Sequence, residues 1–249
     1  MISHRVVTRL ACLAALLSCD KNGVQQLPLE PLAGAQMKFF NFGLNAPGVN
    51  FYADNAKVGT TSDPLGVRYS FAAANGAYTA IAPGQYTFAA RIATGANKDT
   101  TISSLAISVE DGKSYSYYLS GLYNSSTRHV DAFVLEDSSV AAIDTSIAYV
   151  RFVNTMYNSG PLSLNAANTF THDTLALGSV VIYKAASAFT PIPTGVYDLF
   201  VPITDTTAIT RAGQSFLGAH LYTITARGDI TITSSTATNR PFLDNTPNR

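Results

Sequence analysis

The sequence MKFFN, residues Met37 to Asn41, has a second version, VRFVN, at Val150 to Asn154. Each version reads, in order, apolar, basic, phenylalanine, apolar and asparagine. Two further landmarks recur in the same order, PGQYTF (83–88) with TGVYDLF (194–200) and GKSYSYYLSG (112–121) with HLYTITARG (220–228). Recurring landmarks are the signature of a repeated structural unit, so the chain is predicted to contain one unit twice, in copies of about 100 residues.

Apolar and polar residues alternate within each copy, as half-buried strands require. In YTFAARI, the side chains of Tyr86, Phe88 and Ile92 share one face of a predicted strand. DITITS places Ile230 and Ile232 on one face in the same way. No long amphipathic helix competes with these strands. Short strands separated by frequent turn signals predict an antiparallel sandwich of about seven strands per copy.

The expected fold class is therefore all-β. We expect two tandem antiparallel β-sandwiches, immunoglobulin-like or transthyretin-like, after a signal peptide and a flexible tether. The first sandwich is predicted over 37–137 and the second over 147–249, with the segment SSVAAIDTS (138–146) as the linker. Neither copy contains a cysteine, so packing alone must hold each core.

The first copy carries a family resemblance. MKFFNFGLNAPGVNFYADNAKVG (37–59), followed by APGQYTF and VEDGKSYSYYLSG, resembles the bacterial family catalogued as domain of unknown function 4397. The resemblance implies a β-sandwich and tandem copies behind a lipoprotein signal, and it implies no catalytic residues. The second copy departs from the pattern, since NSGPLSLNAANT (158–169) lacks the Val-x-x-Tyr motif and the Asp-Asn turn of the first copy.

The N-terminus has the order of an export signal, with basic residues before a short apolar run. The run ends in LLSC, Leu16 to Cys19, which resembles the bacterial lipoprotein box, and the alternative is an ordinary secretory signal. We expect a signal peptide over 1–18, lipidation of Cys19 and a tether over 19–36. Spanning a bilayer takes about 20 apolar residues, so a permanent transmembrane helix is not expected. The predicted location is the outer membrane or cell surface of a Gram-negative bacterium.

Composition excludes several functions. The 16 basic and 16 acidic residues balance, which leaves no basic footprint for nucleic acid. The histidines lack the HExxH pattern, and no phosphate-binding loop or GxSxG elbow occurs, so no enzyme, cofactor or metal is expected. The pairs His129 with Asp131 and His172 with Asp173 could supply half of a metal site, but solvated surface is the favoured interpretation.

SYSYYLSGLYN (114–124) is the most suggestive stretch for binding. As a strand it places Tyr115 and Tyr117 on one face, predicted to be core, and leaves Tyr118 and Tyr123 as candidate surface contacts for a ligand. We therefore expect a non-catalytic, lipid-anchored envelope protein with a structural, adhesive or assembly role. The alternative is an accessory module that binds a surface glycan or another ligand. The expected partners of the protein are the membrane, through the lipid anchor, and an envelope protein or a glycan.

Overall fold

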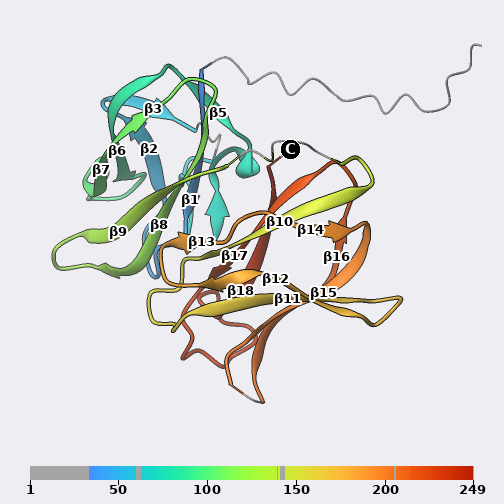
Figure 1. Ribbon diagram of the computed structural model, residues 1–249. Helices are drawn as coiled ribbons and strands as arrows, with labels where there is room; N and C mark the ends of the chain where they lie inside the picture. Colours follow the sequence, from blue (N-terminus) through green and yellow to red (C-terminus); the bar gives the residue numbers. More distant parts are fainter. Residues whose placement is uncertain (1–33, 60–62, 139, 141–143, 205, 249) are drawn as a thin grey trace, which may run out of the picture. The chain divides into compact units, whose positions relative to one another are not determined.

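The computed structural model describes residues 34–59, 63–138, 140, 144–204 and 206–248, which form β-strands, one 3-10 turn and connecting loops (Figure 1). The first half contains β1 (Ala35–Asn41), β2 (Val49–Ala53), β3 (Ala56–Val58), β4 (Phe71–Ala72), η1 (Ala73–Gly76), β5 (Thr79–Ile81), β6 (Gly84–Ile92), β7 (Thr101–Val109), β8 (Ser114–Asn124) and β9 (His129–Glu136). The second half contains β10 (Ile147–Asn154), β11 (Leu162–Asn168), β12 (Thr174–Val181), β13 (Ala185–Ala186), β14 (Thr190–Pro193), β15 (Gly195–Pro202), β16 (Ala208–Phe216), β17 (Leu221–Arg227) and β18 (Phe242–Pro247). The all-β prediction is confirmed.

Both halves use the same sheet plan. The first half has the sheets β4-β1-β8-β9, with β5 also on β1, and β3-β2-β6-β7. The second half has β13-β10-β17-β18, with β14 on β10, and β12-β11-β15-β16. Even the register repeats, because Met37 pairs with Tyr115 in the first half and Val150 pairs with Tyr222 in the second.

The structure corrects three details of the prediction. The pairs β1 with β8 and β10 with β17 are parallel, because the chain crosses to the other sheet before it returns. Each half has nine strands among its described residues, where about seven were expected. The predicted strand at 229–234 is a turn, in which the Asp229 carboxylate accepts the N–H of Thr231 at 2.9 Å.

The predicted boundaries are only partly open to comparison with the structure. Strand β1 begins at Ala35, so the last two residues assigned to the tether belong to the first sheet instead. Pairing with β5 and β8 holds them there. The predicted signal peptide and Cys19 lie outside the described residues, and the sandwich boundaries remain a prediction.

Each half has its own hydrophobic core. In the first half, Phe39 from β1, Phe88 from β6 and Tyr117 from β8 lie in one buried cluster. Tyr115 belongs to the same cluster, which confirms that Tyr115 and Tyr117 are core residues. The second core contains the corresponding Phe152 of β10, with side chains of β15 and β17. Aromatic packing reinforces the first core, where the Phe39 and Phe51 rings stack with centroids 5.1 Å apart.

A third buried cluster joins the two halves. Phe40, Tyr118 and Phe133 come from the first half, and Val153 comes from the second. Strands β1 and β10 are consequently covered on both faces, one by their own core and the other by the opposite half. The prediction that Tyr118 is a surface contact is therefore wrong, because the second half covers its face of β8.

A polar network crosses the same junction. Arg151 forms an ion pair with Asp137, and their side chains are only 3% and 2% exposed. The second carboxylate oxygen of Asp137 accepts hydrogen bonds from the hydroxyls of Tyr78 at 2.7 Å and Ser116 at 2.8 Å. Burial by itself lowers the pKa of Arg151. The Asp137 charge and other nearby groups act in the opposite direction and together have the larger effect, so the pKa is raised and the guanidinium stays charged. The Asp137 carboxylate thus binds side chains from both halves.

The junction generates a first prediction. Asp137→Asn removes the charge that compensates Arg151, and breaking a buried pair from one side costs about 3 to 5 kcal/mol. We expect urea unfolding to report a loss of this size in the free energy of unfolding. Glu110→Gln is the matched control, because Glu110 pairs with Lys113 at the surface, where solvent screening leaves an exposed pair little net effect on stability. Equal losses for the two variants would contradict the assignment of Asp137.

A second prediction concerns alkaline stability. Burial raises the pKa of Tyr118 to about 12, above the ordinary value of 10.0 that it regains on unfolding. The protonated Tyr118 hydroxyl contributes stability to the folded state that is fully present below pH 10. This contribution is lost as the pH rises from 10 through 12. The free energy of unfolding of Tyr118→Phe minus that of wild type should therefore increase by about 1 kcal/mol from pH 8 to pH 11. Denaturation curves whose separation stays constant over this range would contradict the burial of the hydroxyl.

Candidate functional site

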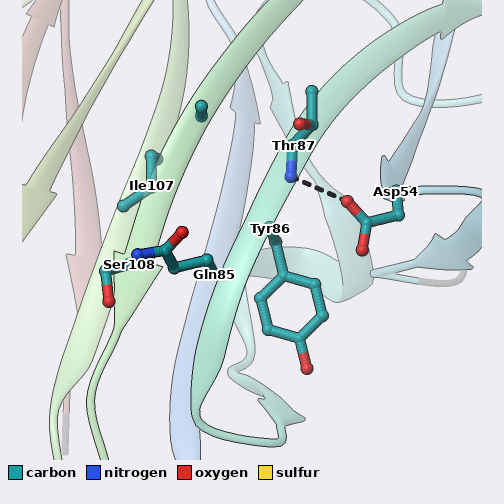
Figure 2. Close-up of a pocket in the computed structure, with 7 residues that line it drawn as sticks. Asp54, Gln85, Tyr86, Thr87, Ile107 and Ser108 are labelled. Carbon is teal, nitrogen blue, oxygen red and sulfur yellow. Dashed lines mark hydrogen bonds between the residues drawn. The ribbon is translucent and has the colours of Figure 1, made fainter.

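A shallow pocket of about 480 Å³ lies on the sheet β3-β2-β6-β7, where β6 and β7 run side by side (Figure 2). Its lining comes from these two strands and from the turn between β2 and β3: Asp54, Gln85, Tyr86, Thr87, Ala106, Ile107 and Ser108. The pocket is open to solvent along one side. Its lining mixes polar and apolar groups, and the polar ones are able to form hydrogen bonds with a ligand at the surface.

Strand alternation explains the hollow. Gln85 pairs with Ser108 and Thr87 pairs with Ala106, and all four side chains are exposed. Small side chains at three of these positions leave space above the sheet. Tyr86, between them, packs against the first core instead. The period-two pattern therefore produces one polar face and one core face from adjacent residues.

Asp54 forms the rim of the pocket. Its backbone lies in the left-handed region, at a φ of 52°, in the turn that leads from β2 to β3. Its N–H donates to the Thr87 carbonyl at 2.9 Å, and its Oδ1 accepts the Thr87 N–H at 2.8 Å. Figure 2 shows the other carboxylate oxygen turned away from this bond. Two bonds to β6 thus fix a carboxylate at the edge of the hollow.

A cation covers the aromatic ring on the same sheet. The Arg91 guanidinium lies 4.3 Å from the Tyr52 ring centroid. It also donates to the Asp54 carbonyl oxygen and to Asn55 Oδ1, both at 3.3 Å. One face of Tyr52 is therefore occupied by the guanidinium.

An apolar edge in the second half forms a different kind of surface. Strand β12 ends the order β12-β11-β15-β16, and it contains no charged residue. Val180 is 62% exposed, Ile182 just beyond the strand is 63% exposed, and Phe170 in the preceding turn is 90% exposed. We call these three residues together with β12 the β12 edge. Edge strands of natural proteins usually carry charges or proline that prevent pairing, and this strand carries neither; a bulge at 178–180, with Gly178 at a φ of 82°, is its one irregularity among the described residues.

The predicted site residues do not meet in one place. Tyr118 is buried at the junction, and Tyr123 is half-buried against the first core. Asp131 forms an ion pair with Lys184 of the second half. The described residues contain no group of three histidine, cysteine or acidic side chains placed to hold a metal ion.

Sequence reasoning missed both surfaces. The β12 sequence, TLALGSVV, is as apolar as a central strand, so only its place in the sheet order reveals it as an edge. The Asp54-Asn55 turn was visible as a motif. Its contact with β6 depends on a pairing between Ala53 and Phe88 that local patterns do not specify.

Two solved structures resemble this fold remotely. A family CBM26 carbohydrate-binding module from Eubacterium rectale Amy13K, solved in complex with maltoheptaose, is 9% identical, with 82% of this chain and 98% of that chain covered and a TM-score of 0.24. A putative cell adhesion protein from Bacteroides ovatus ATCC 8483 is 9% identical, with 87% and 96% covered and a TM-score of 0.22. Likeness this remote carries no information about ligands.

No curated protein matches the sequence. Within the described residues, no helix has the length and apolar character needed to cross a membrane. A family model described as "Domain of unknown function (DUF4397)" matches residues 35–165, which is more than half of the 249 residues. The match begins at the first residue of β1 and runs into β11. The chain therefore belongs to the DUF4397 family.

Proposed function

We propose that this protein is a non-catalytic, lipid-anchored component of the bacterial cell envelope that binds another envelope protein through the β12 edge. The observation that carries the proposal is an uncharged edge strand of eight residues with strongly exposed apolar side chains at its end and in its preceding turn. The lipid anchor would be Cys19, on the strength of the LLSC box.

The chemistry of the β12 edge fits strand addition. A partner strand that pairs with a sheet edge gains main-chain hydrogen bonds, while alternate side chains supply specificity. Val180 and Ile182 would bury their exposed apolar surface against such a partner, and Phe170 would extend the contact beyond the strand. Burying apolar area contributes roughly 25 cal/mol per Å², which makes these side chains the main source of affinity.

A non-catalytic role agrees with the chemistry of the pocket. Among the residues that line it, Asp54 is the single titratable carboxyl group, and one of its oxygens is engaged by Thr87. General acid and base catalysis commonly needs two groups with matched protonation states. The pocket residues are better suited to holding a ligand than to transforming it.

A glycan is the second candidate ligand, and the pocket supports it. Gln85, Thr87 and Ser108 present carboxamide and hydroxyl groups on one face, beside the Asp54 carboxylate. Such a group of donors and acceptors matches the hydroxyls of a sugar ring. The Tyr52 ring nearby is covered on one face by Arg91, which reduces its use for stacking.

The third prediction tests the proposed partner site. A tagged full-length protein is cross-linked in its native envelope, and the proteins recovered with it are quantified by mass spectrometry. Val180→Lys puts a charge into the proposed strand pairing, and we expect it to reduce recovery of a specific partner at least about tenfold, equivalent to 1.4 kcal/mol. Leu122→Lys is the control, because Leu122 is 52% exposed on β8, outside the β12 edge.

The outcomes separate the two candidates. Recovery that falls for Val180→Lys and persists for Leu122→Lys supports the protein partner. Unchanged recovery for Val180→Lys contradicts it. Reproducible sugar binding on a glycan array that is lost in Gln85→Ala and kept in Val180→Lys would replace the first candidate with the second.

A further inference from the structure

Lys38 is a buried amine at the junction of the two halves. Its side chain occupies the position in MKFFN that Arg151 occupies in VRFVN, and the residue is only 1% exposed. Arg151 has an ion pair with Asp137, whereas Lys38 has none within the described part of the chain. Its Nζ instead donates to the Pro247 carbonyl at 2.6 Å and lies 3.4 Å from Oδ1 of Asn248.

The surroundings make the neutral form of this amine more accessible than in an ordinary lysine. The pKa of Lys38 is lowered to about 8, mainly by burial; the Asp137 charge opposes this shift, and the Arg151 charge adds to it. Roughly a tenth of the Lys38 side chains would then be neutral at pH 7. A neutral lysine amine in a desolvated site is an activated nucleophile.

The side-chain amide of Asn248 is held as an electrophile. Thr223 Oγ1 donates to Asn248 Oδ1 at 3.0 Å, and the Arg151 Nε donates to Thr223 Oγ1 at 2.9 Å. This chain of donors ends on a cation, so it polarises the carbonyl and would stabilise negative charge on its oxygen. The Asn248 N–H also donates to the Leu221 carbonyl at 2.7 Å, which fixes the backbone beside β17.

From this arrangement we infer that Lys38 and Asn248 form an intramolecular isopeptide bond. The Nζ lone pair attacks Cγ of Asn248, the Nζ–Cγ bond forms, and the carbonyl π electrons move onto Oδ1. One proton passes from Nζ to Nδ2. The carbonyl then re-forms, the Cγ–Nδ2 bond breaks, and Nδ2 leaves as ammonia. The reaction consumes no oxidant and no co-reactant.

The packing supplies the proximity that this uncatalysed reaction lacks in solution. Holding reacting groups in contact gives a large effective concentration, and the Lys38 Nζ lies 3.4 Å from Oδ1, the oxygen bonded to the carbon that it would attack. The Lys38 Nζ also lies 4.3 Å from the Tyr78 ring centroid, which excludes water from one side of the amine. The bond would join residues 210 positions apart and would tie β1 of the first half to the end of β18 in the second.

The link has a mechanical consequence. A covalent bond across the junction would prevent the halves from separating under tension or after local opening. It would also close a long loop and so reduce the conformational entropy of the unfolded chain. This consequence holds for either ligand discussed above, so the inference does not depend on the proposed function.

The fourth prediction is a peptide map of the full-length protein. Trypsin should fail to cleave after Lys38, and the digest should contain a branched peptide that joins residues 22–57 to residues 228–249. Its mass should be lower than the summed masses of the linear peptides 22–57 and 228–249 by one ammonia, the group that leaves when the link forms. Fragmentation should locate the branch at Lys38 and Asn248.

Two variants complete the test. Lys38→Arg keeps a cation and removes the amine, so both the ammonia loss and the branched peptide should disappear. Lys113→Arg is the matched control, because it removes an exposed lysine and should leave the link intact. Unmodified wild-type mass with cleavage after Lys38 would overturn the inference, whether or not any variant folds. Ammonia loss that persists in Lys38→Arg would also overturn it, because it would indicate cyclisation of an asparagine instead.

Discussion

The ion pair between Arg151 and Asp137 is the interaction on which the arrangement of the two halves depends. The basic residue of VRFVN lies on a strand that is covered on both faces, so its charge has no access to water and must be compensated inside the protein. Asp137, at the end of the first half, supplies that compensation and also accepts hydrogen bonds from Tyr78 and Ser116. The apolar cluster around Tyr118 seals the same junction.

The two copies solve the same problem differently. In the second copy, arginine meets a carboxylate, whereas in the first copy Lys38 meets a backbone carbonyl and an asparagine side chain. The difference leaves one buried amine without an ion pair and beside a polarised amide. The repeat is therefore symmetric in strand register and asymmetric in chemistry. The pocket on β6 and β7 and the β12 edge continue this asymmetry, since they lie in different halves.

Much of the fold could be predicted because strand alternation and the repeated landmarks are local. They gave the all-β class, the correspondence between β1 and β10, and the core positions of Tyr115 and Tyr117. Alternation also assigns Tyr117 and Tyr118 to opposite faces of their strand, but it does not show that the second half covers the face of Tyr118. Tyr118 was therefore placed at the surface, although it is buried. The β12 edge and the contact of Lys38 with Asn248 depend on sheet order and on long-range packing, which local patterns do not contain.

The junction should make the two halves unfold as one cooperative unit, and differential scanning calorimetry measures this. A single heat-capacity transition whose calorimetric enthalpy equals its van't Hoff enthalpy is the predicted result, because neither half could unfold without exposing the shared cluster and breaking the Arg151 pair. Two separate transitions, or a calorimetric enthalpy about twice the van't Hoff value, would show that the halves unfold independently and would contradict the account.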